Sequence, residues 1–380
     1  MKAQGKRVIK SKFKILRNIV MGFLIILMVI FITIPLNHKY CSAKEYDILS
    51  EAGYINPVSV GNYNLNVCMY GNENGKHTLV GISGMGVHEF AVSIRPFMEK
   101  FDEENKIVVI DRAGYGMSDD TKEKQTVERI VSDYREALKN IGCAPPYVLV
   151  AHSLGGNYAT YWVNTYPDEI EGIVYLDPTY ILGDASYIEN HPGEEVWWEE
   201  EISNAPALLQ KTGLARLMLA SSEYKPWFSI NTSEQEELKK AFWEHSICTT
   251  AQNSESACTK ENMIATAKIM KENAVPKLYI DAAYYTKEDM KEYYRTLYDN
   301  GMQWLFADDI NPQNEEAMDI LWEKDGKVRV ANYERFIKNY VKNLGNCKYV
   351  NIPGDHYIYE YKPDEVAKEV KVFIEELSNE

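Results

Sequence analysis

One short segment constrains the fold of this chain more than any other. Residues 147–152, Tyr-Val-Leu-Val-Ala-His, form an apolar run that suits a strand buried on both faces, and residues 154–166 have a helical pattern that Pro167 ends. Similar runs recur along the chain with helical stretches between them. This alternation predicts a doubly wound, mostly parallel α/β sheet. The predicted strands are residues 64–69, 78–83, 106–111, 147–152, 172–177, 277–281 and 348–352.

Helices and two interruptions complete the predicted organisation. The core helices are expected at residues 89–100, 126–140, 154–166 and 363–377. Residues 178–274 lack a strand pattern and are predicted to form a helical cap inserted after Asp177, with helical stretches at 194–201 and 234–245. Residues 284–346 are too long for an ordinary loop and should also be mostly helical. The α/β core therefore comprises residues 57–177 and 275–380.

The N-terminal region joins a basic segment to an apolar one. Residues 1–18 carry seven Lys or Arg and no acidic residue, and residues 19–36 form an apolar run close to the length of a membrane-spanning helix. We expect a single-pass signal anchor in the cell membrane, with the basic end in the cytoplasm, a polar linker at 37–56 and the remaining chain outside. A cleaved signal peptide, with Cys41-Ser42-Ala43 as its cleavage site, is the alternative and would give a secreted protein.

The charge balance limits the class of partner. The net charge is -15, and because seven of the 41 basic residues lie in residues 1–18, the remainder sets 34 basic against 56 acidic residues. Such a body repels phosphate backbones, and no basic stripe with interleaved aromatic residues is present. The sequence therefore argues against a nucleic-acid partner and favours a small molecule.

The six cysteines do not form a disulfide scaffold, and none has Cys-x-x-Cys spacing. Cys248 and Cys258 bracket nine mostly polar residues, so an exported protein could close this stretch as a disulfide loop. Two free thiols are the alternative. No His-Glu-x-x-His and no calcium-loop pattern is present, so we expect no metal site.

Ser153 lies where the strand at 147–152 meets the following helix. In a strand–turn–helix of this kind the turn is strained, and the residues two before and two after the Ser must be small. Ala151 and Gly155 satisfy that requirement. Ser153 is therefore a candidate nucleophile; the alternative is a Ser that only caps the helix.

A glycine-rich loop after an earlier strand offers the partner of such a nucleophile. Residues 81–86 read Gly-Ile-Ser-Gly-Met-Gly, and their flexible backbone can turn an N–H toward a developing negative charge. We expect the Met85 and Leu154 N–H groups to form an oxyanion hole. The phosphate-binding alternative fails, because neither Gly-Lys-Ser/Thr nor G-x-G-x-x-G opens a helix there, and no cofactor is expected.

These motifs together resemble the α/β-hydrolase family. The elbow at 151–156, the loop at 83–86 and the segment 111–118, Asp-Arg-Ala-Gly-Tyr-Gly-Met-Ser, carry the resemblance, which extends from about Tyr54 to the end. Two positions depart from the family pattern: Ala151 replaces the first Gly of G-x-S-x-G, and Ser83 replaces the usual His before Gly. The segment 111–118 is expected to support the structure without a catalytic role.

In this family the base follows the nucleophile in the chain. His191, His245 and His356 follow Ser153, and the first two lie in the predicted cap. His356 lies in a loop directly after the last predicted strand, which is the position of the family's His. The resemblance therefore implies that His356 is the base.

The acid has two candidate positions in the family. Asp177 ends the strand that follows the elbow helix, and Asp281 ends the next strand beyond the cap, where the usual Gly-x-x-Asp turn is missing. We favour Asp177, with Asp281 as the alternative and Asp289 as a third. The role of Asp177 would be to hold the His356 tautomer and stabilise the imidazolium.

The predicted function is a serine hydrolase that acts on a carboxylic ester through an acyl-enzyme, in the esterase and lipase class. A peptidase of the proline-iminopeptidase type and an acyltransferase would use the same triad, and a catalytically silent surface binding protein is the alternative of another class. The Ser at the elbow argues against haloalkane dehalogenase chemistry, which uses Asp there. Aromatic residues of the two insertions are candidates to line the substrate pocket, namely Trp197, Trp198, Trp227, Trp243, Tyr284, Tyr285 and Trp304.

Overall fold

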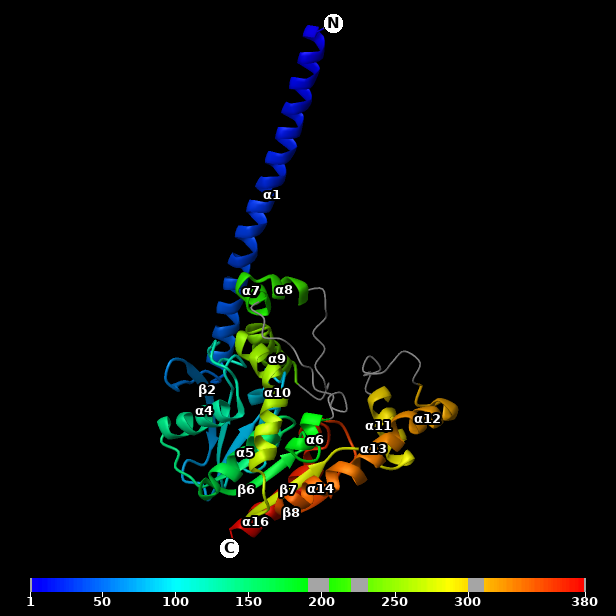
Figure 1. Ribbon diagram of the computed structural model, residues 1–380. Coiled ribbons are helices and arrows are strands. Elements are labelled where there is room, and N and C mark those ends of the chain that lie inside the picture. Colours follow the sequence, from blue (N-terminus) through cyan, green and yellow to red (C-terminus); the bar gives the residue numbers. More distant parts are fainter. Residues whose placement is uncertain (1, 191–204, 220–231, 300–310, 379–380) are drawn as a thin grey trace.

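The computed structural model describes residues 2–190, 205–219, 232–299 and 311–378 (Figure 1). Within these residues an eight-stranded sheet forms in the order β1-β2-β4-β3-β5-β6-β7-β8. β1 and β2 pair antiparallel with their neighbours, and the strands from β4 to β8 run parallel. The predicted doubly wound, mostly parallel α/β sheet is confirmed. The strands are β1 (Pro57–Ser59), β2 (Asn64–Gly71), β3 (Thr78–Ile82), β4 (Lys106–Ile110), β5 (Tyr147–His152), β6 (Ile170–Leu176), β7 (Asn273–Asp281) and β8 (Gly345–Asn351).

Helices cover both faces of the sheet because its central strands are apolar on both sides. One face packs against α4 (Val127–Asn140) and α5 (Gly155–Thr165), together with α10 (Thr250–Ile269) and α14 (Lys338–Asn343). The other face packs against the helices α2 (Phe90–Ser93), α3 (Arg95–Met98), α9 (Ser233–Ser246), α15 (Ile358–Tyr361) and α16 (Pro363–Leu377). This arrangement leaves the carboxyl ends of the parallel strands to the insertions.

The two insertions are helical where the structure describes them. Residues 178–272 contain α6 (Ala185–Asn190), α7 (Ala205–Thr212) and α8 (Leu214–Leu219), followed by α9 and α10. The predicted helix at 194–201 lies outside the described residues. The second insertion contains α11 (Lys287–Asp299), α12 (Glu315–Leu321) and α13 (Lys327–Asn332), then α14, with π-helical turns between the last three helices. Figure 1 shows the second insertion projecting beyond the β8 edge of the sheet.

Two of the predicted boundaries that change lie near prolines. The single helix expected at 89–100 is divided into α2 and α3, with Pro96 in the first turn of the second helix. β7 begins at Asn273, four residues earlier than expected, and its pairing with β8 shifts register between Asn273 and Lys277. Pro276 lies in that irregular stretch, where a missing N–H costs no regular ladder hydrogen bond.

The stretch between Cys248 and Cys258 is a helix and not a loop. The Thr249 side chain accepts a hydrogen bond from the Gln252 N–H, and the Gln252 side-chain oxygen accepts one from the Thr249 N–H, so a capping box starts α10 at Thr250. Both cysteines are free thiols. The disulfide-closed loop is therefore wrong, since the polar residues belong to a helix that packs on the core.

The N-terminal helix α1 (Lys2–Glu51) is longer than the sequence predicts. The polar segment expected to be a linker, residues 37–56, is helical as far as Glu51. The cause is its packing on the cap: Leu49 is fully buried, and Arg216 of α8 contacts Glu45. From Lys14 onward α1 is long and apolar enough to cross a membrane, with none of its most apolar window buried, and a signal sequence meets the same criterion.

Candidate active site

Ser153 sits on a sharp turn between β5 and α5. Its φ of 51° is positive, which is uncommon for a residue other than glycine. The surrounding backbone holds this conformation: the Ser153 carbonyl accepts from the Gly156 N–H (2.9 Å) and from the Thr179 N–H (2.8 Å). The turn thus has the strained geometry of a nucleophile elbow.

Two glycines allow the elbow to approach the loop after β3. A Cβ added at Gly84 would lie 2.7 Å from the Ser153 Cβ, and one added at Gly155 would lie 2.5 Å from the Ile82 carbonyl oxygen. Both distances are shorter than real contacts. The glycines predicted from the motifs are therefore required by the close packing of the loop against Ser153.

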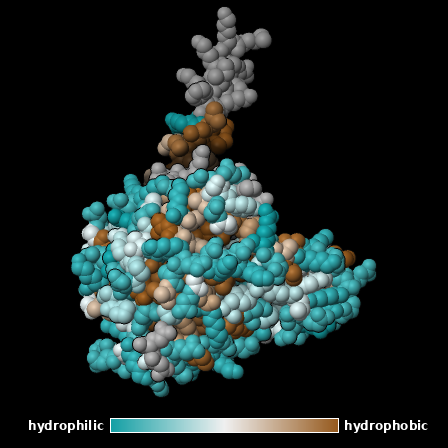
Figure 2. Space-filling model, turned by 60° about the horizontal axis from the view of Figure 1, so that its bottom comes forward, coloured by the Kyte–Doolittle hydropathy of each residue, from teal (hydrophilic) through white to brown (hydrophobic). Residues whose placement is uncertain are grey.

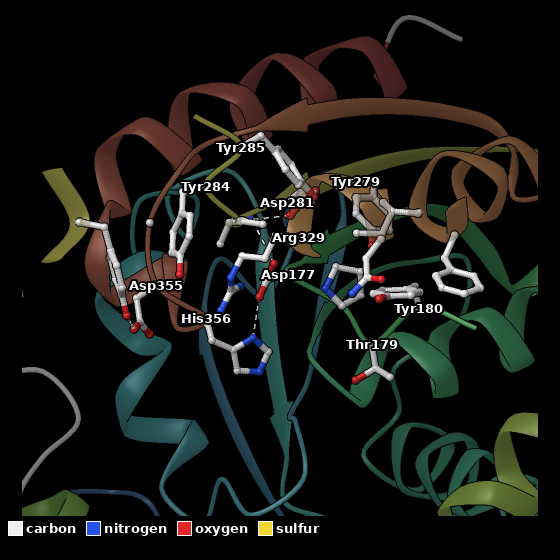
Figure 3. A pocket seen from close by; sticks show the side chains of 18 of the residues that line it. Asp177, Thr179, Tyr180, Tyr279, Asp281, Tyr284, Tyr285, Arg329, Asp355 and His356 are labelled. Carbon is white, nitrogen blue, oxygen red and sulfur yellow. Dashed lines mark hydrogen bonds and ion pairs between the residues drawn. The ribbon is translucent and has the colours of Figure 1, made fainter. Parts of the chain in front are cut away.

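Asp177 and His356 meet at the carboxyl ends of β6 and β8. The His356 Nδ1 lies 2.6 Å from the Asp177 Oδ2, while the Asp177 Oδ1 accepts from the Ala282 N–H (2.9 Å). Asp177 also has a positive φ, 45°. The structure therefore brings together His356 and Asp177, the residues that the sequence analysis expects as base and acid (Figure 3).

The pKa of His356 reflects two opposing effects. Burial opposes the charged form, but the hydrogen bond to Asp177 and the charges of Asp177 and Asp355 outweigh it and raise the pKa of His356 above its usual value. An imidazolium that forms during a reaction is stabilised by the same contacts.

Asp281 is close to Asp177 but does not contact His356. Its Oδ2 accepts from the hydroxyls of Tyr285 (2.6 Å) and Tyr349 (2.7 Å), and its Oδ1 accepts from the Ala283 N–H (3.0 Å). Burial and the charge of Asp177 raise the pKa of Asp281. Its oxygens are therefore occupied by other partners, and Figure 3 shows Asp177 between Asp281 and His356.

Asp289 and His245, two further sequence candidates, are not at this site. Asp289 lies in the first turn of α11 and accepts from the Thr286 hydroxyl (2.6 Å). His245 lies on α9 beside Glu45 of α1. His191 lies outside the described residues.

The two N–H groups expected to bind an oxyanion have no protein acceptor among the described residues. Met85 follows Gly84 in the loop that packs on Ser153, and Leu154 is the N-cap residue of α5. A helix N-terminus also favours negative charge. The donors are therefore available to a bound group.

Arg112 belongs to the segment 111–118 that was expected to support the structure, and it packs beside Ser153 through the loop after β3. It is 2% exposed, and its guanidinium donates to the carbonyl oxygens of Ser83 (2.6 Å) and Gly84 (2.8 Å) and to the Ser83 hydroxyl (2.7 Å). An ion pair of 3.0 Å joins it to Glu255 of α10. Arg112 is the second residue after β4, which ends at Ile110. It fixes the loop that carries Met85.

His152 was not predicted to contribute to this site. Its ring is fully buried, 4.6 Å between centroids from the ring of His356, and its Nε2–H donates to the His356 carbonyl (3.0 Å). Burial, and then the charge of His356, hold the pKa of His152 well below its usual value, so it is neutral. His152 thus ties the His356 loop to the strand that precedes Ser153.

A cavity of about 510 Å³ borders Asp177 and His356 on the side of the second insertion. Arg329 enters it above the ring of Tyr284, 4.6 Å from the centroid (Figure 3). Ser153 is not among the described residues that line it. Of the predicted aromatic residues, Tyr284 and Tyr285 line the cavity and Trp243 of α9 does not. The others, Trp197, Trp198, Trp227 and Trp304, lie outside the described residues. The other aromatic and acidic lining residues are Tyr180, Tyr279, Tyr293, Phe336, Asp281 and Asp355.

Comparison with known proteins identifies the class of this chain. Residues 79–369 match the Alpha/beta hydrolase family, so the chain belongs to that family. The fold and the family model thus agree on the class of protein to which this chain belongs.

The individual relatives are more distant. An uncharacterized protein of Bacillus subtilis, YbdG, is 33% identical over 44% of this chain and 50% of its own length. Epoxide hydrolase 4 of Mus musculus is 27% identical over 32% of this chain and 34% of its own length. This chain thus spans about half or less of these relatives. The crystal structure of haloalkane dehalogenase DbeA from Bradyrhizobium elkani superposes with a TM-score of 0.53 at 14% identity, over 85% of this chain and 98% of that one. The last likeness concerns the fold alone.

Proposed function

We propose that this protein is a serine hydrolase that cleaves a carboxylic ester through an acyl-enzyme. Ser153 is the nucleophile, His356 the general base and Asp177 the acid. The observation that carries the proposal is the 2.6 Å contact between the His356 Nδ1 and the Asp177 Oδ2. With Nδ1 committed to Asp177, the Nε2 of His356 is left to exchange a proton with the Ser153 hydroxyl.

The proposed reaction follows from these contacts. The Ser153 Oγ attacks the ester carbonyl while His356 takes its proton, and the Met85 and Leu154 N–H groups donate to the oxyanion. Collapse of the tetrahedral intermediate releases the alcohol, which receives the proton from His356. Water, activated by His356, then attacks the acyl-enzyme and releases the acid.

The nucleophile separates this proposal from the chemistry of some relatives. Dehalogenase chemistry in this fold uses Asp at the elbow, whereas this chain has Ser153. The tyrosine-rich cavity beside His356 supports an apolar or aromatic group on the substrate.

The location is part of the proposal. The basic residues 1–18 and the exposed apolar residues 19–36 of α1 support a single-pass anchor with the catalytic body outside the cell membrane.

The test is hydrolysis of p-nitrophenyl esters, from acetate to long acyl chains, by the full chain in detergent micelles. Ser153→Ala and His356→Ala should each lower kcat/KM by roughly 10³-fold or more. A fluorophosphonate probe should label the wild type and not Ser153→Ala. Equal labelling of both proteins would show that the elbow assignment is wrong. A wild type that neither hydrolyses any ester nor reacts with the probe would favour a silent binding protein on the same fold.

A further inference from the structure

The turn between α7 and α8 meets α1 where its apolar run ends. Gly213 forms this turn with a φ of 78°, and a Cβ added there would lie 2.5 Å from the His38 Cβ and 3.2 Å from the Ile34 carbonyl oxygen. Only glycine allows this approach. Ile34 is two residues before the end of the apolar run at Leu36, or about 3 Å along a helix axis. The turn is therefore level with the end of the apolar run.

Buried charges hold this contact in place. The Arg216 guanidinium of α8 pairs with Glu45 of α1 (2.5 Å) and with Glu244 of α9 (3.1 Å), and the side chain of Arg216 is only 12% exposed. One arginine thus joins the anchor helix to two cap helices. These pairs and the packing of Gly213 on His38 place α7 and α8 beside α1 at this level.

Apolar side chains are exposed at the same level. Leu208 of α7 is 63% exposed and Leu217 of α8 is 56% exposed, although the body is mainly hydrophilic on the face shown in Figure 2. Tyr40, four residues beyond the apolar run, is 71% exposed, as expected of a residue at a membrane interface. Figure 1 shows α7 and α8 at the end of the body from which α1 emerges.

We propose that α7 and α8, residues 205–219, lie on the outer surface of the phospholipid bilayer, with Leu208 and Leu217 inserted among the lipids. This second contact rests on the proposed membrane anchor. It orients the body, because a single helix leaves rotation about its axis free and an adjacent helical hairpin on the lipid removes that freedom. The cap side of the active site then faces the membrane, where ester-bearing amphiphiles are concentrated.

The experiment uses the full chain in vesicles of phosphatidylcholine and phosphatidylglycerol that contain a phosphatidylcholine with a photoreactive acyl chain. Lipid adducts are mapped by peptide mass spectrometry after irradiation. We expect adducts over residues 19–36 and 205–219, and at least about fivefold fewer over α12 and α13. Leu208→Asp combined with Leu217→Asp should reduce the adducts over 205–219 and leave those over 19–36 unchanged. The matched control is Ile320→Asp with Val328→Asp, since both side chains are 51% exposed in the second insertion.

The outcomes separate the two proposals. Adducts over 19–36 with only background over 205–219 in the wild type would overturn the hairpin contact and leave the anchor intact. Background over both segments would overturn the anchor, and the hairpin contact with it. Because the wild-type map decides between these results, the test does not depend on whether the Asp variants fold.

Discussion

The cap and the second insertion support opposite sides of the candidate active site, and they use different chemistry. On the cap side, Glu255 of α10 forms a buried ion pair with Arg112, which holds the loop before Met85. Asn262 of the same helix accepts from the Val127 N–H (2.7 Å). The cap is thus joined to the core by charged and amide groups that are almost fully buried.

On the side of the second insertion, the contacts come from phenols. Tyr293 donates to Asp355 (2.7 Å), the residue before His356, and Tyr285 donates to Asp281 (2.6 Å). Loss of a phenol hydroxyl removes one hydrogen bond, whereas loss of one partner from a buried ion pair leaves an unpaired charge. We call the region of Arg112, Glu255 and the loop before Met85 the oxyanion side, and the region of His356 with its neighbouring carboxylates the acid–base side. We expect a substitution in the ion pair of the oxyanion side to cause a large loss of stability, and the loss of a tyrosine hydroxyl on the acid–base side to cause a small one. The following variants test this comparison.

The largest difference in activity is expected between substitutions of the two neighbouring carboxylates, Asp177 and Asp281. Asp177→Asn should lower kcat/KM by roughly 10³- to 10⁴-fold, because the His356 tautomer and imidazolium lose their partner. Asp281→Asn should cost less than about tenfold, since Asp281 does not contact His356. Ester hydrolysis by the two variants measures the difference, and a larger loss in Asp281→Asn would assign the acid role to Asp281.

The contact between His356 and Asp177 also predicts how activity depends on pH. His356 must be neutral to act as a base, so activity falls as the pH decreases through its raised pKa. Asp177→Asn removes the main contact that raises this pKa, and the acid limb of kcat/KM should move to lower pH. If the acid limb of kcat/KM stays at the same pH in Asp177→Asn, the group that titrates is not His356.

Arg112→Met tests the oxyanion side. The substitution leaves Glu255 buried without its cation, so we expect a loss of about 3–5 kcal/mol in the free energy of unfolding. Thermal unfolding followed by circular dichroism measures it. In Arg112→Met combined with Glu255→Met the buried charge is gone, and part of the stability should return. If the double variant were as unstable as the sum of the single ones, the pair would not be coupled.

A smaller effect on stability is expected from Glu89, which lies near Lys239 of α9 on the cap side. Burial raises the pKa of Glu89 to about 7, and its Oε2 has no hydrogen-bond partner among the described residues. The folded state therefore binds more protons than the unfolded state between the ordinary value of about 4.5 and about 7, so stability falls as the pH rises through this window.

Glu89→Gln should remove that loss. The gain relative to the wild type should grow by on the order of 1–3 kcal/mol between pH 5 and pH 8. Melting temperatures at both pH values test this, with Glu103→Gln, an exposed carboxylate, as the control. A gain of the same size at both pH values would exclude titration of Glu89 as its cause.

The smallest effect is expected in the second insertion. Tyr293→Phe removes one hydrogen bond to Asp355 and should cost about 1 kcal/mol of stability and only a few-fold in kcat/KM. Tyr285→Phe should cost less, because Tyr349 still donates to Asp281. Activity losses of 100-fold in either variant would contradict the expectation that the loss of these hydroxyls has a small effect.

Much of the core could be predicted from the sequence. β5 and α16 have the predicted bounds, since a continuous apolar run and a proline start define them locally. The elbow residues Ser153 and Gly155 were recognised because a tight turn demands small neighbours. The sequence left the pairing of Cys248 and Cys258 open because polar residues permit a loop or a solvated helix face, and the capping box of Thr249 and Gln252 decides for the helix. The polar linker predicted after Leu36 is a helix as far as Glu51, since this segment contacts Arg216, which lies far away in the chain.

The sequence by itself determined the doubly wound sheet and the position of the turn at Ser153, because strand burial and turn sterics depend on neighbouring residues. The two candidate acids came from the resemblance to the α/β-hydrolase family. Only the tertiary structure decided that Asp177, and not Asp281, contacts His356, and that Arg112 holds the loop beside Ser153. These contacts join residues far apart in the chain. Which carboxylate reaches the histidine depends on how β6, β7 and β8 are aligned in the sheet, and no local pattern encodes that alignment.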